Sequence, residues 1–446
     1  METPENIEKL SQKLRQVLGA QYVSTKANDR IAYARDQWQR SLIRFRHGQL
    51  ENLPDLVIWP KDAQQAAEAL RICYEAEIPI MPVGAGSAVT GAASPIYKGV
   101  IIDLKRLNRI RTFRADKSLV DVESGFVGLH LEEALERAGC TLGHFPSSIL
   151  CSSLGGWVAT RSAGQNSSLY GKIEDMVVDI EIALPTGEVR WLEGDFTLLE
   201  LFMGSEGRFG LITAVRLRVH PAPKARTFRG LIFPTLENAW AALRQLMQKE
   251  GNPPAVLRLY DNAGTFISSH PKAKGSRPQG HQHIYHHTTT LPMKLEPKSN
   301  QLEKRLPTWL EGLRKRLSST LKEIIQQGAF SAMERAQTTN KWIHRLTSSS
   351  CLLIVGCEGY DNQDAEQQMQ QALKICDEEQ AKDLGPNPGW HWFDTRHDVS
   401  FKQPQAFRSG AFADTMEVAA SWSQLPDLYK EVKGAIQKDA LVMAHF

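Results

Sequence analysis

Apolar side chains follow two different spacings along the first hundred residues. Between residues 7 and 18 they recur every three or four positions, which predicts an amphipathic helix, and a basic segment follows at 35–47. The short apolar run at 55–59 predicts a buried strand, and Asp62 stands where the next helix needs an N-cap. A second strand is predicted at 78–83, so this region forms a strand–helix–strand unit.

Short strands separated by turns dominate the next part of the chain. The predicted strands span residues 100–103, 119–122, 177–184, 188–191 and 210–219. The predicted helices between them span residues 128–138 and 153–163. Many short strands with few long helices are typical of an α+β domain. The Pro-Ala-Pro sequence at 221–223 marks its predicted end.

A second α+β pattern fills the remainder of the chain. The predicted strands and helices alternate at residues 228–233, 236–249, 255–260, 351–357 and 362–378. A polar, His- and Pro-rich stretch at 270–300 interrupts them and predicts a mobile loop. The apolar residues 441–446 are strand-like with no turn after them, so we expect the sequence to stop inside a domain. The predicted parts are an N-terminal helical segment, an α+β domain and an incomplete α+β domain, at residues 1–50, 51–223 and 224–446.

Composition narrows the class of protein. The 53 Lys and Arg residues nearly balance the 50 Asp and Glu residues, and a net charge of +3 argues against nucleic-acid binding. No apolar run approaches the roughly 18 residues of a membrane-spanning helix, and the polar N-terminus predicts no signal peptide. The six cysteines include no CxxC pair, which predicts reduced thiols. We therefore expect a cytoplasmic, multi-domain enzyme.

Three clusters of small residues each lie beside a predicted strand. The first cluster, at 82–88, contains two glycines, and such a loop can aim successive backbone N–H groups at one phosphate. Val89 stands where a Rossmann fingerprint has its third glycine, so that motif is absent. The second cluster spans 147–164 and the third spans 204–212. Turns between strands also use Gly and Ser, but three clusters in one domain favour a binding site.

Four motifs, PVGAGS, SSLGGWVATRSAG, YGKIEDMV and GSEGRFGLITAV, occur in this order along the chain. Over about residues 50–222 they resemble the FAD-binding domain of the vanillyl-alcohol oxidase (PCMH-type) flavoprotein family. Within that family, the second and third motifs are most similar to the branch of alkyldihydroxyacetonephosphate (alkylglycerone-phosphate) synthases. The residues that carry this likeness are Gly155, Gly156, Trp157, Thr160, Arg161, Gly164, Tyr170, Gly171, Ile173, Glu174 and Asp175.

The resemblance implies a PCMH-type FAD-binding domain followed by an α+β substrate (cap) domain lying over the flavin. The first cluster would hold the FAD pyrophosphate through backbone amides within its loop, which comprises Pro82, Val83, Gly84, Ala85, Gly86, Ser87 and Ala88. The flavin and ribityl chain would be lined by Ser147, Ser148, Ile149, Leu150, Cys151, Ser152, Ser153, Thr160, Arg161, Ser162 and Ala163. The adenine side would be closed by Glu206, Gly207, Arg208, Phe209, Gly210, Leu211 and Ile212. No His lies between residues 82 and 94, where some members of the family bond FAD covalently, so we expect non-covalent FAD.

The resemblance also implies a reaction. The expected enzyme exchanges the acyl chain of acyl-dihydroxyacetone phosphate for a fatty alcohol in ether-lipid synthesis. One alternative is an FAD-dependent D-2-hydroxy-acid dehydrogenase or oxidase of the lactate or glycolate type, and another is a non-catalytic FAD-binding remnant. Arg408, followed by Lys402, is the candidate contact for the substrate phosphate. The family's flavin-proximal Tyr and its histidine-rich segment are expected beyond the last residue, so no other catalytic residue is predicted.

Two further patterns each have a purely structural alternative. Residues 304–325 form a basic, Trp-containing helical stripe, which is typical of a helix docked on its own domain and also of one on an anionic membrane surface. The histidines at 281, 283, 286 and 287 lack supporting Cys or carboxylate ligands, so no metal site is expected there. The residues His391, Asp394, His397 and Asp398 predict a polar loop. A monomer and a homodimer are both open.

Overall fold

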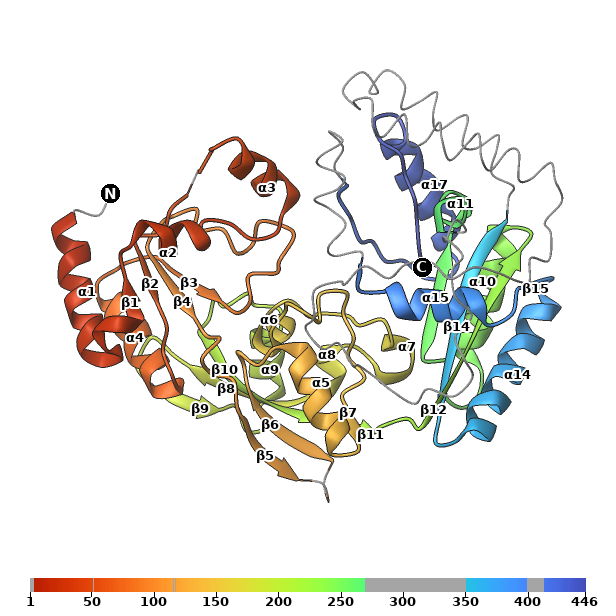
Figure 1. The fold of residues 1–446 in the computed structure, drawn as a ribbon, viewed down its shortest axis with the longest axis horizontal. Coiled ribbons are helices and arrows are strands. Elements are labelled where there is room, and N and C mark those ends of the chain that lie inside the picture. The colour runs from red at the N-terminus through yellow and green to blue at the C-terminus, as the bar shows by residue number, and fades with distance from the viewer. Residues whose placement is uncertain (1–3, 51, 115, 117, 269–349, 399–412) are drawn as a thin grey trace, which may run out of the picture. The chain divides into compact units, whose positions relative to one another are not determined.

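The computed structural model describes residues 4–50, 52–114, 116, 118–268, 350–398 and 413–446 (Figure 1). The chain divides into two compact units, each of which is described by itself. The larger unit comprises Met1–Asn262, Ser349–Phe401 and His445–Phe446. The smaller unit comprises Ala263–Ser348 and Lys402–Ala444.

The first sheet of the larger unit has the strand order β1-β2-β4-β3. Its strands are β1 (Val23–Ser24), β2 (Leu56–Ile58), β3 (Ile80–Val83) and β4 (Val100–Asp103). β2 and β3 both run parallel to β4, and a parallel pair needs a crossover such as the helix α4 (Ala63–Glu75). The side chain of Asp62 accepts a hydrogen bond from the Gln65 amide and caps α4, as predicted.

The N-terminal part of the chain forms four helical segments. They are α1 (Pro4–Leu18), the 3₁₀ turn η1 (Ala20–Tyr22), α2 (Ala27–Ala32) and α3 (Gln39–Arg46), of which α1 and α2 contact this sheet. The apolar stripe of α1, through Leu10, Leu14 and Leu18, packs in one buried cluster with α4 and with β2 and β4. The parallel strands β2 and β4 are buried along their whole length, which explains their continuous apolar sequence.

The second sheet has the strand order β5-β6-β10-β8-β9 and is antiparallel throughout. Its strands are β5 (Ile110–Arg114), β6 (Leu119–Glu123), β8 (Val177–Ala183), β9 (Val189–Trp191) and β10 (Leu211–Arg218). A two-stranded pair is formed by β7 (Cys140–Thr141) and β11 (His220–Pro221). The helices among these strands are α5 (Gly128–Arg137), α6 (Leu154–Ala159), α7 (Ser167–Tyr170), α8 (Ile173–Met176) and α9 (Phe196–Phe202).

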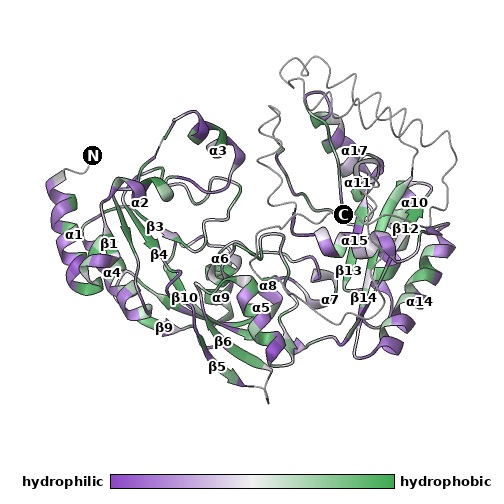
Figure 2. Cartoon of the chain, viewed as in Figure 1, coloured by the Kyte–Doolittle hydropathy of each residue, from purple (hydrophilic) through white to green (hydrophobic). Residues whose placement is uncertain are grey.

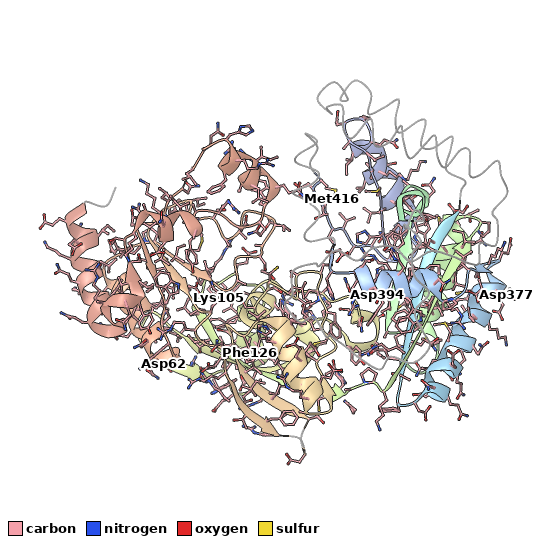
Figure 3. All side chains as sticks on the ribbon, viewed as in Figure 1. Asp62, Lys105, Phe126, Asp377, Asp394 and Met416 are labelled. Atoms are coloured by element: carbon pink, nitrogen blue, oxygen red, sulfur yellow. The ribbon has the colours of Figure 1, made fainter. Side chains whose placement is uncertain are left out.

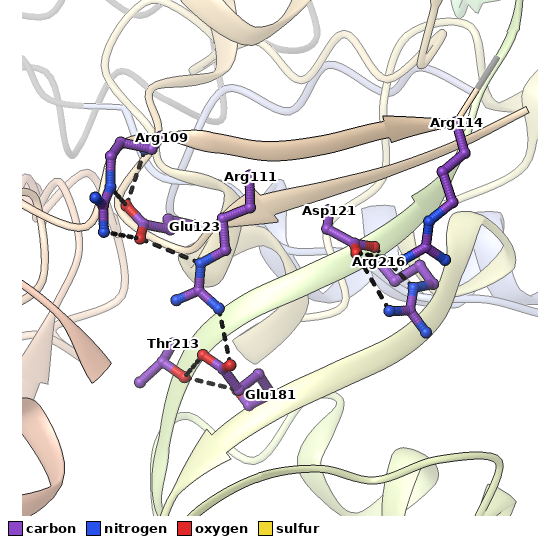
Figure 4. A network of polar contacts seen from close by, with 8 residues as sticks. All are labelled: Arg109, Arg111, Arg114, Asp121, Glu123, Glu181, Thr213 and Arg216. Atoms are coloured by element: carbon purple, nitrogen blue, oxygen red, sulfur yellow. Dashed lines mark hydrogen bonds and ion pairs between the residues drawn. The ribbon is translucent and has the colours of Figure 1, made fainter. Parts of the chain in front are cut away.

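A network of charged side chains lies across the second sheet (Figure 4). The buried carboxylate of Glu123 pairs with Arg111, which also pairs with Glu181 at 2.8 Å. The Asp121 carboxylate accepts a hydrogen bond from Arg216 at 2.7 Å. Alternate residues of a strand point to the same face, so the acidic residues of β6 and β8 meet the arginines of β5 and β10.

The third sheet has the order β13-β14-β12-β15 and is also antiparallel. Its strands are β12 (Ala225–Phe233), β13 (Val256–Tyr260), β14 (Cys351–Gly359) and β15 (Lys382–Asp383), and its helices are α10 (Leu236–Gln248), α14 (Asn362–Glu378) and α15 (Asn387–Thr395). Phe228, Val256 and Ile354 pack against Trp390, Trp392 and Phe393 of α15. Figure 2 shows the hydrophobic positions concentrated on the strands of the sheets.

The described part of the smaller unit contains most of α11 (Asn262–Ser268) and all of α17 (Leu425–Ile436). In α17 the ammonium of Lys433 donates a hydrogen bond to the Tyr429 hydroxyl one turn earlier, at 2.5 Å. This hydrogen bond gives the buried Lys433 ammonium an acceptor within its own helix.

The structure corrects two of the sequence predictions and adds elements that were not predicted. The helix predicted at 153–163 ends at Ala159, because Arg161 adopts a left-handed φ of 50°. Residues 387–395 form the helix α15 where a polar loop was predicted, and its aromatic residues lie against the third sheet. The strand β5 was not predicted. Of the residues 441–446, for which a strand was expected, only His445 forms a bridge, to Tyr260 of β13, and Phe446 exchanges two backbone hydrogen bonds with Leu259.

Candidate functional site

The first predicted cluster is a loop that follows β3, at the carboxyl ends of three parallel strands. Its two end carbonyls are engaged: the Gly84 carbonyl accepts from the Lys105 ammonium at 3.2 Å, and the Ala88 carbonyl accepts from the Gln37 amide at 2.8 Å. Within the described part of the chain, the amides of Ala85, Gly86 and Ser87 donate no hydrogen bond. Free N–H groups in a turn are the donors that hold an anion.

The second predicted cluster lies directly against this loop. A Cβ atom added to Gly84 would lie 2.1 Å from the Oγ and 3.3 Å from the Cβ of Ser153, so the loop and the second cluster are in close contact at this position. Ser153 is 1% exposed, and its Oγ has no hydrogen-bond partner among the described residues. A buried hydroxyl without a partner is costly in a folded protein, and it is therefore suited to a ligand that supplies the missing bond.

The third predicted cluster meets the first two. A Cβ atom on Gly207 would lie 2.3 Å from Cγ of Pro82, which brings the third cluster against the start of the first. The Glu206 amide donates to the Ala159 carbonyl at 3.0 Å, which ties the third cluster to the second. Three segments that are far apart in the sequence therefore converge on one place, as a common ligand requires.

Several predicted site residues have structural contacts instead of free side chains. Arg161 pairs with Glu200 at 2.7 Å and donates to the Met203 carbonyl at 3.1 Å, so it braces the segment before the third cluster. The side chains of Ile149, Leu211 and Ile212 are buried in the core. A ligand could reach those three positions only through the backbone.

His144 is a buried residue of this region that the sequence analysis missed. Its Nε2 lies 3.2 Å from the Ser162 Oγ, and its ring packs edge-on against Trp157 with centroids 4.7 Å apart. Trp157 in turn donates from Nε1 to the Ser152 Oγ at 2.7 Å. Burial lowers the pKa of His144 to about 3, so the imidazole is neutral and supports the second cluster without adding charge.

Tyr170, from the third sequence motif, reaches the third sheet. Its hydroxyl donates to Oε2 of Glu358 on β14 at 2.6 Å, and Arg226 of β12 donates from Nε to the other carboxylate oxygen at 2.7 Å. The ring of Tyr170 also packs on His220, with centroids 5.1 Å apart. Desolvation and the nearby Glu358 carboxylate raise the pKa of Tyr170, so the hydroxyl remains a donor at neutral pH.

Other sequence candidates lie outside the described residues. They are Lys402, Arg408, the histidines at 281–287 and the helical stripe at 304–325. Among the described residues, no group of His, Cys, Asp and Glu is arranged to hold a metal ion. In the same part of the chain, no helix is long and apolar enough to cross a membrane.

The donors at this convergence fit a dinucleotide diphosphate. The free amides of Ala85, Gly86 and Ser87 would hold its anionic oxygens, and the Ser153 hydroxyl lies beside them. Comparison with known proteins agrees with this reading. The FAD binding domain matches residues 54–193, and the C-terminal domain of FAD linked oxidases matches residues 311–446.

Over these residues the chain thus matches two domains of FAD-dependent enzymes, its cofactor is FAD, and the predicted α+β fold class is confirmed. The alkyldihydroxyacetonephosphate synthase of Dictyostelium discoideum is 28% identical over 421 residues, which cover 92% of this chain and 60% of that protein. A solved alkyldihydroxyacetonephosphate synthase structure aligns with a TM-score of 0.73 and 26% identity, over 100% of this chain and 78% of its own.

A second kind of relative shares a smaller part of the chain. The mitochondrial D-lactate dehydrogenase [cytochrome] of Arabidopsis thaliana is 30% identical over 210 residues, which cover 44% of this chain and 37% of that protein. The likeness to the synthases thus extends over nearly the whole chain, although the chain spans only 60% of the Dictyostelium synthase.

Proposed function

We propose that this chain acts as an FAD-dependent enzyme that exchanges the acyl chain of acyl-dihydroxyacetone phosphate for a fatty alcohol. The observation that supports this proposal is the extent of the likeness to alkyldihydroxyacetonephosphate synthases, which covers 92% of the chain in sequence and 100% in structure. A small-molecule, lipid-derived substrate follows from that likeness. The D-lactate dehydrogenase relative, which covers 44% of the chain, supports the alternative of a hydroxy-acid dehydrogenase less well.

The residues of the site have separate roles in this proposal. Bound FAD supplies the reactive ring, while the protein fixes its position. The amides of Ala85, Gly86 and Ser87 bind the diphosphate, and Gly84 allows the loop to approach Ser153. His144 stays neutral and holds the second cluster in place. Arg408 remains the predicted contact for the substrate phosphate, and non-covalent attachment of FAD remains a prediction.

A single set of assays separates the candidate functions. Purified protein loaded with FAD is given acyl-dihydroxyacetone phosphate and a radiolabelled fatty alcohol, and label in the ether product is measured. A parallel anaerobic sample receives D-lactate or glycolate, and the flavin absorbance is followed. Ether product without bleaching supports the proposed transfer, whereas bleaching by a hydroxy acid supports the dehydrogenase. FAD binding with neither result supports a non-catalytic protein.

Gly84→Ala is the matched variant for these assays. The added Cβ would overlap the Ser153 hydroxyl and lie 3.3 Å from the Ser153 Cβ, so either the hydroxyl turns away or the loop moves. We expect the variant to lose FAD affinity and, with it, whichever activity the wild type has. Gly139→Ala is the control, since a Cβ there meets nothing within 4 Å, although its φ of 75° adds backbone strain. Equal FAD affinity in Gly84→Ala and wild type would contradict the assigned site.

The location of the protein stays a prediction. We propose a cytoplasmic protein in which residues 304–325 dock on their own domain, with contact to an anionic membrane surface as the alternative. Flotation with anionic liposomes decides between the two, because a docked helix leaves the protein unbound.

A further inference from the structure

A polar cluster lies behind the glycine loop, at the carboxyl ends of β2, β3 and β4. It consists of Tyr33, Trp59, Asp103 and Lys105, the last of which is labelled in Figure 3. The Asp103 carboxylate is fully buried and accepts hydrogen bonds from the Tyr33 hydroxyl and from the Lys105 ammonium. Trp59 donates from Nε1 to the Tyr33 oxygen at 3.1 Å.

The three hydrogens of the Lys105 ammonium have three acceptors around them. Besides Asp103, these are the Tyr33 hydroxyl at 3.5 Å and the Gly84 carbonyl at 3.2 Å. Asp103 largely compensates the charge of Lys105. Lys105 therefore affects a ligand mainly through its contact with the Gly84 carbonyl. Desolvation and Asp103 raise the pKa of Tyr33, so its hydroxyl remains a proton donor within the cluster.

The contact with Gly84 has a geometric consequence for the next residue. In a trans peptide the C=O and the following N–H point in opposite directions, and all described peptide bonds are trans. With the Gly84 carbonyl turned toward Lys105, the Ala85 amide must point to the other side. At the far end of the loop, the backbone N–H of Gln37 donates a hydrogen bond to the Ala88 carbonyl and so fixes the orientation of that peptide as well. Between these two anchors lie the amides that have no acceptor of their own.

We propose that Lys105, held by Asp103 and Tyr33, is a positioning residue that orients the loop amides of residues 85–87 for the diphosphate of FAD. This inference rests on FAD binding by the loop. Lys105 acts through the Gly84 peptide, and it need not contact the cofactor. Removal of the Lys105 ammonium frees the Gly84 peptide to rotate. Ordering the loop then reduces the free energy gained when the anion binds.

The test compares cofactor fragments on the apoprotein. Lys105→Met should weaken binding of FAD and of ADP by about 10- to 100-fold, the range for a lost hydrogen bond to a charged group, and should leave riboflavin binding unchanged. Tyr33→Phe keeps every charge but removes one support of Lys105, so a smaller loss in the same pattern is expected. The control Lys13→Met makes the same charge change at an exposed position of α1. Dissociation constants are measured by isothermal titration calorimetry.

The outcomes distinguish this inference from the proposed function. If the wild type binds no FAD, the FAD site itself is wrong. If the wild type binds FAD and Lys105→Met binds FAD and ADP as tightly as Lys13→Met, only the role of Lys105 is overturned. Equal losses for ADP and riboflavin would also overturn it, because they indicate general damage to the fold. Should Lys105→Met fail to fold, the ratio of ADP to riboflavin affinity in Tyr33→Phe decides the question.

Discussion

The charge of His144 is set by its surroundings. The ring is fully buried beside Trp157, and burial lowers the pKa of His144 to about 3 from the ordinary value of 6.5. The folded protein therefore keeps the ring neutral where the unfolded chain takes up a proton. The stability that the folded protein gains with a neutral His144 is fully present above pH 6.5. It is lost as the pH falls from 6.5 toward 3, because the unfolded chain then binds a proton that the folded protein does not.

We expect acidification to destabilise the protein partly through this residue. Below about pH 6.5 the free energy of unfolding should fall by up to about 1.4 kcal/mol per pH unit from His144 alone. His144→Gln, which takes up no proton, should lose that part of the pH dependence, whereas His130→Gln at an exposed position of α5 should keep it. Urea unfolding at about pH 7 and pH 5 measures the difference. Identical pH dependence in His144→Gln and wild type would show that another group is responsible.

At the residue scale, the sequence predicts where the candidate site lies, but it does not predict which of the side chains there face a ligand. Close backbone approach selects Gly and Ser, so the clusters around Gly84 and Ser153 were visible as runs of small residues. Whether a particular side chain faces a ligand depends on tertiary contacts. Leu211 belongs to the core and Arg161 to an ion pair, and nothing in the local sequence separates them from their neighbours.

Among the elements, the second sheet depends on charged pairs as well as on apolar packing. Arg216 of β10 donates to Asp121 at 2.7 Å, lies 3.7 Å from Asp179 and packs on the Trp191 ring. Both carboxylates have side chains that are less than a tenth exposed. A buried carboxylate that loses its partner is much less stable than one that keeps it.

Arg216→Met should therefore lower the free energy of unfolding by about 2–3 kcal/mol, a value reduced because Arg114 still pairs with Asp121. Arg190→Met removes an exposed ion pair with Glu188 in the same sheet and should cost less than about 1 kcal/mol. Chemical unfolding of the two variants gives the comparison. If both variants lose the same stability, the network contributes no more than a surface pair.

Elements with an apolar period were predictable, and those without one were not. The strands β2 and β4 are continuous apolar runs, and α4 has both its cap and its stripe in the sequence. The strand β5 was missed because two of the five residues in its sequence, IRTFR, are arginines, whose carboxylate partners lie on β6 and β8. In α15 the aromatic residues are interleaved with His391 and Asp394, which concealed the apolar face.

At the scale of the whole molecule, Tyr170 links the FAD-binding residues to the third sheet within the larger unit. Its hydroxyl shares the Glu358 carboxylate with Arg226. Ser168, two residues earlier, donates to the Pro254 carbonyl at 2.7 Å, just before β13. Ser168 and Tyr170 both belong to α7, and Tyr170 is the first residue of the third sequence motif. The likeness to the synthases therefore includes a residue whose observed contact is with the third sheet and not with the glycine loops.

Tyr170→Phe should loosen this connection without affecting the loops. The ring can still pack on His220, but among the described residues the Glu358 carboxylate keeps only Arg226 as a partner. Losing one hydrogen bond to a charged acceptor is worth about 1.5–3 kcal/mol, so amide exchange in α7 should accelerate by about 10- to 100-fold if it proceeds by local opening. FAD affinity should stay within about twofold of wild type, since no loop contact is lost. The control Tyr74→Phe changes an exposed tyrosine of α4, and hydrogen–deuterium exchange of both variants is compared with wild type. Unchanged protection of α7 in Tyr170→Phe would mean that the segment is held by Ser168 and its backbone alone.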